Sequence, residues 1–203
     1  MGRRSHRLPI AVQRERLAQE AARLMIEHGI SDFRQAKLKA AERLAIATAG
    51  TLPSNAQIQA RLAERQRIFE GHDHTFHIAR LRRIAADIMQ LLGAFEPRLV
   101  GAVLAGTATI TTSIELHVFT DTPEQVAAEL RSRNLAFRDS ERRMRFASGQ
   151  SARVPAYAFS RDGERVVVSV FPEKGLREAP LSPVDRRPMA RAARPKLLQL
   201  LDA

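Results

Sequence analysis

The 203-residue chain contains no cysteine and no tryptophan, and only one tyrosine. The absence of cysteine excludes disulfide bonds, thiolate chemistry and cysteine-ligated zinc sites. Its apolar runs are short, and none approaches the roughly 20 residues that a membrane-spanning helix needs. The basic N-terminal residues are not followed by the apolar segment of a secretory signal. The sequence therefore predicts a cytoplasmic protein with no membrane partner.

Lysine is also scarce, so arginine sets the charge balance. The lysines are Lys37, Lys39, Lys174 and Lys196, yet the formal net charge is +11. Arginine presents a planar fork of donors that binds phosphate in a bidentate manner, which lysine does not. A basic excess of this size favours an anionic partner such as a nucleotide or nucleic acid, unless the arginines merely solvate the surface.

The first half of the chain has the pattern of amphipathic helices. Apolar residues recur with helical spacing over residues 11–28, 31–50, 54–71 and 75–92, and a glycine marks the end of each segment. Ser54 and Gln57 have the spacing of a capping box, which marks the start of the third helix. With 44% hydrophobic residues, the chain is globular and long enough to bury a core.

Two segments of this half allow a more specific interpretation. Residues 37–62 have the outline of a DNA-binding helix-turn-helix with basic flanks, but the connection between the two helices is longer than the turn of that motif. His72, His74 and His77 could ligate zinc together with Asp73. Their spacing spans the predicted start of the fourth helix and includes no regular i, i+4 pair of histidines, which favours exposed capping residues.

The second half is organised around residues 99–121. An apolar run of strand length is followed by a Gly/Thr-rich linker and then by an alternating run. In that run Ile114, Leu116 and Val118 would point to one face of a strand and Glu115 to the other.

Further elements follow this strand. Thr122 and Pro123 predict a helix start, and residues 154–171 have the pattern of a β-hairpin. A proline-rich loop and a short C-terminal helix come last. We therefore predict an α+β fold made of a helical region over residues 1–96, a mixed β-sheet flanked by helices over 97–180, and a C-terminal strap with a short helix over 181–203.

The glycines and the carboxylate of this region resemble the signature of the nucleotidyltransferase superfamily that includes DNA polymerase beta. In that family a Gly-Ser pair ends the first strand, and two acids spaced one apart follow on the next strand. The pair falls here on Gly101 and Ala102, a second loop glycine falls on Gly106, and the two acidic positions fall on Ser113 and Glu115. With residues 181–189 included, the chain resembles a group of bacterial proteins that carry a divergent form of this domain, which implies a fold but no substrate.

The resemblance implies the residues of a site. Catalytic positions would be Glu115 and Ser113, with Glu115 as the ligand of a magnesium ion, and the triphosphate of a nucleotide would lie at Gly101, Ala102, Gly106 and Thr107. Ala102 lacks the hydroxyl of the family, Ser113 replaces one carboxylate, and the position of a third carboxylate falls on Ser169. The intact mechanism uses two magnesium ions about 4 Å apart, for which one carboxylate is a poor basis.

The most basic segment, residues 131–153, contains seven arginines and two acids. We predict a polyanion-binding site at Arg138, Arg142, Arg143 and Arg145. The preferred interpretation is a nucleotidyltransferase-like protein with a degenerate site, which binds a nucleoside triphosphate or RNA with little or no catalysis. Two alternatives stay open: an active magnesium-dependent nucleotidyltransferase that moves a nucleotidyl group to an unknown acceptor, and DNA binding through residues 37–62.

Overall fold

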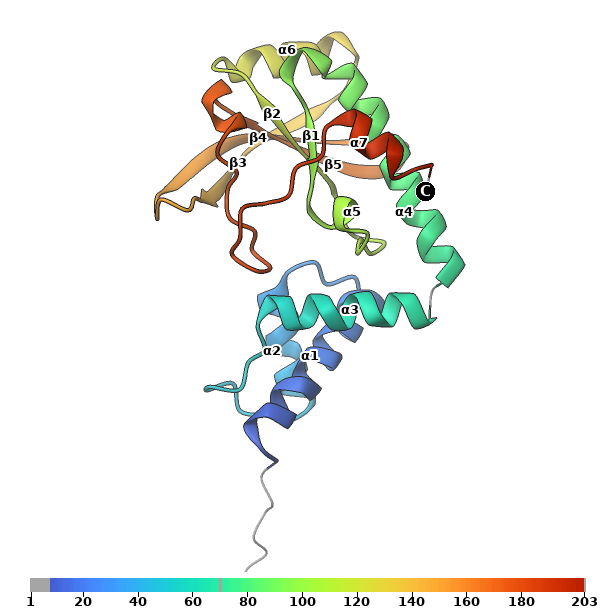
Figure 1. Cartoon of the computed structure of the whole chain (residues 1–203), viewed down its shortest axis with the longest axis vertical. Coiled ribbons are helices and arrows are strands. Elements are labelled where there is room, and N and C mark those ends of the chain that lie inside the picture. Colours follow the sequence, from blue (N-terminus) through green and yellow to red (C-terminus); the bar gives the residue numbers. More distant parts are fainter. Residues whose placement is uncertain (1–7, 70, 203) are drawn as a thin grey trace, which may run out of the picture. The chain divides into compact units, whose positions relative to one another are not determined.

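The structure, a computed structural model, describes residues 8–69 and 71–202. These residues form two compact units, coloured along the sequence in Figure 1. The helical unit is built from residues up to 71 with 109–111, and the sheet unit from 72–108 and from 112 onward. This division lies earlier than the boundary predicted at Pro97, because the fourth helix shares its core with the sheet. No helix of the described part is long and apolar enough to cross a membrane.

The helical unit consists of α1 (Ile10–Glu27), α2 (Phe33–Arg43) and α3 (Asn55–Phe69). Its core joins Leu17 of α1, Ala36 and Ala40 of α2, and Ile58 and Leu62 of α3, all at most 2% exposed. The alanines carry little side chain, which lets the helices approach closely. The predicted apolar stripes are therefore confirmed as the buried faces of these helices.

The second helix is shorter than the sequence predicts. Its N-cap is Asp32 and not Ser31, because the Asp32 carboxylate accepts the Gln35 backbone N–H at 2.7 Å. It ends at Arg43 and not near Gly50, because the backbone turns into the left-handed region at Ala45, where φ is 52°.

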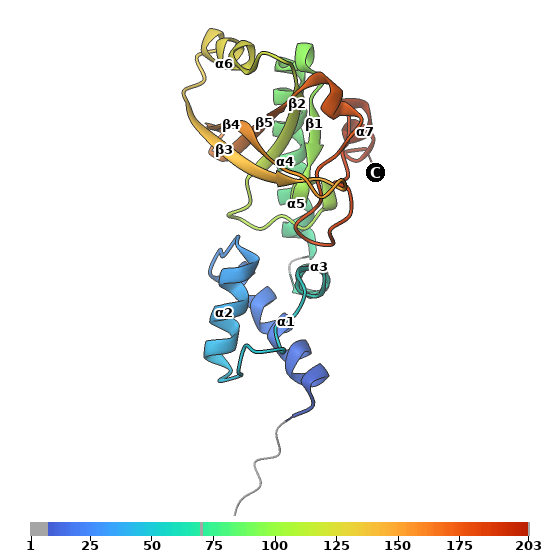
Figure 2. The ribbon, with the colours of Figure 1, turned by 90° about the vertical axis from the view of Figure 1, so that its left-hand side faces the viewer.

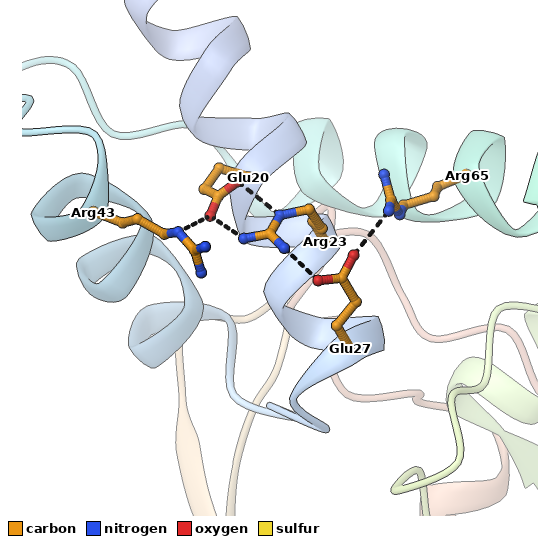
Figure 3. Close-up of polar contacts among 5 residues, drawn as sticks. All are labelled: Glu20, Arg23, Glu27, Arg43 and Arg65. Atoms are coloured by element: carbon orange, nitrogen blue, oxygen red, sulfur yellow. Dashed lines mark hydrogen bonds and ion pairs between the residues drawn. The ribbon is translucent and has the colours of Figure 1, made fainter.

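A network of ion pairs joins the three helices, as Figure 3 shows. Arg23 of α1 pairs with Glu20 at 2.8 Å and also with Glu27. Arg43 of α2 reaches Glu20 at 3.4 Å, and Arg65 of α3 reaches Glu27 at 2.9 Å. The Arg23 hydrogen bond lowers the pKa of Glu20. Three arginines of this unit are thus committed to structural contacts.

The capping box at the start of α3 is confirmed. The Gln57 backbone N–H donates to Ser54 Oγ at 3.1 Å, and the Ser54 N–H donates to Gln57 Oε1 at 2.9 Å. We expect Ser54→Ala to lower the free energy of unfolding by about 1 kcal/mol, because it leaves a helix N–H without its acceptor. Urea denaturation measures the loss. Ser31→Ala, at an exposed serine that does not cap α2, is the control, and an equal loss in the two variants would contradict the capping role.

The sheet unit contains five strands in the order β1-β2-β5-β4-β3. Their bounds are β1 (Arg98–Val100), β2 (Ile114–Phe119), β3 (Phe137–Arg145), β4 (Ser151–Arg161) and β5 (Glu164–Phe171). β2 and β5 are parallel, and the other neighbours are antiparallel. The predicted α+β fold with a mixed sheet is therefore confirmed, and so is the β4–β5 hairpin.

One face of the sheet, here called the helix face, carries the core of this unit. α4 (Gly71–Leu91) and α6 (Pro123–Ser132) cover it. Ile114, Leu116 and Val118 of β2 are fully buried there together with the apolar face of β5. Figure 2 shows α4 behind the strands and α6 at one end of them. The alternation predicted for β2 thus sets which side of the sheet is buried.

The opposite side, here called the strap face, is crossed by residues 172–193, the strap, which includes the short helix η2 (Glu173–Leu176). The Leu181 N–H donates to Arg145 O on β3 at 2.6 Å, and Ala192 exchanges two backbone hydrogen bonds with Leu99 on β1 at 2.8 and 2.9 Å. The strap therefore runs from one edge of the sheet to the other. It leads into α7 (Arg194–Gln199), where Arg194 Nε donates to Ala86 O of α4 at 3.1 Å.

The predicted apolar run at residue 99 is only partly a strand. β1 has three residues, and helix α5 (Gly101–Ala105) begins directly after it. The physical cause lies at Gly101, where φ is +72° and the backbone leaves the extended conformation. The short helix η1 (Gly93–Phe95) precedes β1.

Candidate functional site

The structure places Glu115 beside Gly101. Glu115 lies on the strap face of β2, opposite Val100 of β1 and Val167 of β5. An added Cβ at Gly101 would lie 2.7 Å from Glu115 Oε2. Only glycine therefore fits next to this carboxylate without displacing it. Ala102 follows at the start of α5 and offers no hydroxyl.

The other oxygen of Glu115 is held by an arginine from a distant strand. Arg142 Nη1 on β3 lies 2.7 Å from Glu115 Oε1, and the two side chains are 38% and 27% exposed. In a flat sheet three strand spacings of about 4.8 Å would separate β2 from β3. The contact forms because the β3–β4 ribbon extends past β5 and curves, as Figure 2 shows.

The residues at the predicted metal positions do not fit a two-magnesium site. Ser113 precedes β2, and Ser169 of β5 lies opposite His117 and not opposite Glu115. Glu115 is thus the one carboxylate at the three positions that the resemblance assigns, and Arg142 already neutralises it. Within the described residues, no group of three or more histidine, aspartate or glutamate side chains is arranged to hold a metal ion.

Gly106 and Thr107, predicted at the triphosphate, lie at the other end of α5. The Thr107 N–H donates to Ala102 O at 2.9 Å, so this backbone donor is used within the turn. Around them the carbonyls at the end of α5 face donors: Arg82 Nη2 donates to Leu104 O at 3.1 Å, and His74 Nε2 lies 2.9 Å from Gly106 O. The carboxyl end of a helix, where the carbonyl groups point outward, attracts cations and not phosphate. Gly101 therefore lies beside Glu115, whereas Gly106 lies at the end of α5 that does not favour a phosphate.

The fourth helix begins earlier than the sequence predicts, at Gly71 and not near residue 75. His72, His74 and His77 therefore all lie inside the first two turns of α4. The His74 contact with Gly106 O gives this residue a structural role in the α5 turn.

The four arginines of the predicted polyanion site divide between the two faces of β3. Arg138 and Arg142 pair with Ala158 and Val154, which lie on the strap-face side of β4. Arg143 and Arg145 point to the opposite side, because side chains alternate along a strand. All but Arg142 are exposed, and none of those three forms an ion pair with another described residue. Two of the four arginines, Arg138 and Arg142, therefore lie on the strap face.

Sequence reasoning missed a contact on the same face between the half-buried Arg191 and the buried His117. Arg191 of the strap donates from Nε to His117 Nδ1 at 3.2 Å and from Nη1 to Gly175 O at 2.7 Å. Its guanidinium carbon lies 4.9 Å from the ring centroid of Phe119 and 5.2 Å from that of Phe171. Cation–π contacts therefore add to the hydrogen bonds that fix the strap on the sheet. Because 74 residues separate Arg191 from His117, no local pattern indicates the pair.

Electrostatics on the strap face are dominated by positive charge. The pKa of His117 is lowered to about 3, mainly by burial and in addition by the positive charges of Arg191 and Arg142. Burial also lowers the pKa of Arg191 to about 10, and Arg98 of β1 contributes. Arg98 pairs with Glu96 at 2.9 Å, whereas no described carboxylate pairs with Arg191. Arg142 of β3 and Arg191 of the strap thus act on the same neutral histidine, and Arg142 also pairs with Glu115.

No protein-family model, curated protein or solved structure matches the chain. The resemblance to the nucleotidyltransferase superfamily therefore stays a prediction. At the matching positions, Gly101 directly follows β1, and Glu115 of β2 lies against it.

Proposed function

We propose that the sheet unit is a degenerate nucleotidyltransferase-like domain that binds the phosphate groups of a nucleotide or of RNA on its strap face without catalysing transfer. The observation that carries this proposal is the ion pair between Glu115 Oε1 and Arg142 Nη1 at 2.7 Å. The carboxylate at the position of a catalytic metal ligand is held by a guanidinium, which is itself a phosphate-binding group.

The charges around this ion pair favour an anionic ligand. The charges of Arg142 and Arg191 both act on His117, and the charge of Arg98 acts on Arg191. The exposed Arg138 adds a fourth charge on the same face of β3. Guanidinium groups form short, charge-assisted hydrogen bonds with phosphate oxygens. A phosphate bound here would relieve the mutual repulsion of these arginines.

The donor set supports binding more than catalysis. Two-metal transfer needs carboxylates that hold both ions in line with the attacking and leaving oxygens. Ser113 and Ser169 supply hydroxyls at two of the three positions, and Ser169 is 1% exposed. The helix-turn-helix alternative has weaker support, because residues 44–54 connect α2 to α3 and the motif uses a turn of about 3 to 4 residues.

Matched pairs of arginine variants test the proposal. Arg138→Ala/Arg142→Ala removes two charges from the strap face, and Arg143→Ala/Arg145→Ala removes two from the opposite side of the same strand. We expect the first pair to weaken binding of a fluorescent ATP analogue or of a short single-stranded RNA by about tenfold or more, since each charge-assisted hydrogen bond contributes about 1.5 to 3 kcal/mol. For RNA, the slope of log affinity against log salt should also fall by about 1 to 2.

The control pair should change both quantities by less than about twofold, since its arginines point away from the site. Fluorescence anisotropy at several salt concentrations gives both numbers. Equal losses in the two pairs would indicate diffuse surface charge, and an absence of binding to ATP and to RNA would overturn the proposal. Incubation with labelled nucleoside triphosphates, magnesium, and cellular RNA or protein completes the test. Transfer of label would show an active enzyme instead.

A further inference from the structure

We infer that this site binds nucleotide phosphates without a metal ion, with the Arg142 guanidinium taking the place of the metal and Glu115 holding that guanidinium in position. The inference rests on the proposed function. It starts from the disagreement between the magnesium that the resemblance implies and the residues that are present.

The ion pair with Glu115 leaves other donors of the Arg142 guanidinium accessible to a ligand. Arg142 Nη1 lies 2.7 Å from Glu115 Oε1, and this ion pair is the polar contact that the structure shows for the Arg142 side chain. A guanidinium carries five N–H donors in a rigid plane. With the carboxylate on one edge, donors on the remaining edges can bind phosphate oxygens, and the 38% exposure of Arg142 leaves them accessible. A bound phosphate would therefore contact a cation that is itself held by a carboxylate, as at a metal site, but the cation would be the Arg142 guanidinium.

A magnesium ion would have to compete with Arg142 for Glu115. Magnesium is usually held by one or two carboxylates, by water and by substrate phosphates. At Glu115 it would find one carboxylate and would lie next to Arg142, with the charges of Arg191 and Arg98 nearby. Like charges repel more strongly in a partly buried site than in water. The other carboxylate oxygen, Glu115 Oε2, lies against Gly101, which has no side chain to offer as a ligand.

Two responses of the binding affinity distinguish an arginine site from a magnesium site. Magnesium in solution coordinates the phosphates of a free nucleotide and reduces their negative charge, so it should weaken binding to an arginine site. Replacing Glu115 by glutamine should strengthen binding, because the amide oxygen can still accept from Arg142 and hold it in position, while the carboxylate charge that would repel the ligand is gone. A magnesium-dependent site would respond in the opposite direction to both changes.

The experiment measures the affinity of the full chain for a fluorescent ATP analogue in EDTA and in excess magnesium, with inorganic tripolyphosphate as a base-independent competitor. We expect binding in EDTA to be at least as tight as in magnesium. Glu115→Gln should tighten it about threefold or more, and Arg142→Ala should weaken it about tenfold. Arg143→Ala, on the other side of β3, is the matched control. Arg142→Lys, which keeps the charge but loses the planar fork, should give an intermediate affinity and guards against a folding defect in the alanine variant.

Binding that requires magnesium, or a loss of binding in Glu115→Gln, would overturn the inference and leave the proposed function standing. Absence of binding to ATP, to tripolyphosphate and to RNA under both conditions would overturn the proposed function itself, and this inference with it. Circular dichroism of each variant confirms that affinity is compared between folded proteins.

Discussion

The free energy of unfolding is expected to fall by about 2 kcal/mol between pH 8 and pH 5 because of His117 alone. This side chain is 1% exposed, and its pKa is lowered from 6.5 to about 3 in the folded protein. Burial is the main cause, and the positive charges of Arg191 and Arg142 act in the same direction.

The sign follows from proton uptake in the two states. Above pH 6.5 His117 is neutral in both the folded and the unfolded chain, so its full contribution to stability is present. Below pH 6.5 the unfolded chain gains a proton that the folded protein does not accept until the pH approaches 3. Stability is therefore lost progressively across this window, and a pKa difference of about 3.5 units corresponds to about 5 kcal/mol over the whole of it.

Urea denaturation at pH 8 and pH 5 measures this loss at values where most carboxylates stay ionised. In His117→Asn the amide oxygen can still accept the Arg191 Nε–H, but the residue does not titrate, so the variant should lose about 2 kcal/mol less than the native protein between the two values. His28→Asn, at an exposed histidine outside the sheet unit, is the control and should keep the native pH dependence. If native protein and His117→Asn respond equally to pH, His117 is not the buried neutral group described above.

Elements that depend on neighbouring residues could be predicted from the sequence. The capping box at Ser54 and Gln57 forms as its spacing indicates. The alternation of Ile114, Leu116 and Val118 correctly assigns the buried face of β2, because a strand repeats every two residues. The same rule places Arg142 and Arg143 on opposite faces of β3. The division of the four arginines between the two faces could therefore have been predicted from the sequence.

The contacts that define the site could not be predicted in this way. Glu115 meets Arg142 only because a long ribbon of two strands curves, and neither residue carries a local sign of that curvature. Arg191 meets His117 only because the strap returns across the sheet to pair with Leu99. Gly101 could be expected to approach a ligand, whereas the structure shows that it makes room for a carboxylate of the same chain.

Gly101, the first residue of α5, and Gly106, which follows its last residue, differ in what an added side chain would meet. Gly101 and Gly106 have nearly equal φ values, +72° and +75°, so alanine is strained at both by about 1 to 2 kcal/mol. Their surroundings differ. A Cβ at Gly106 would lie 3.6 Å from Arg82 Nη2, an ordinary contact, whereas at Gly101 it would lie 2.7 Å from Glu115 Oε2.

We therefore expect Gly101→Ala to lower the free energy of unfolding by about 2 to 4 kcal/mol and Gly106→Ala by about 1 to 2 kcal/mol, as measured by urea denaturation. The excess at Gly101 arises because the new methyl group must push the carboxylate away from Arg142. A double-mutant cycle isolates this term. In a Glu115→Ala background, the loss of unfolding free energy caused by Gly101→Ala should fall to that caused by Gly106→Ala. In the native background, Gly101→Ala should change the affinity for nucleotide, whereas Gly106→Ala should not. Equal costs at the two glycines in the native background would show that the carboxylate moves freely, and Glu115 could then not be what holds Arg142 in position.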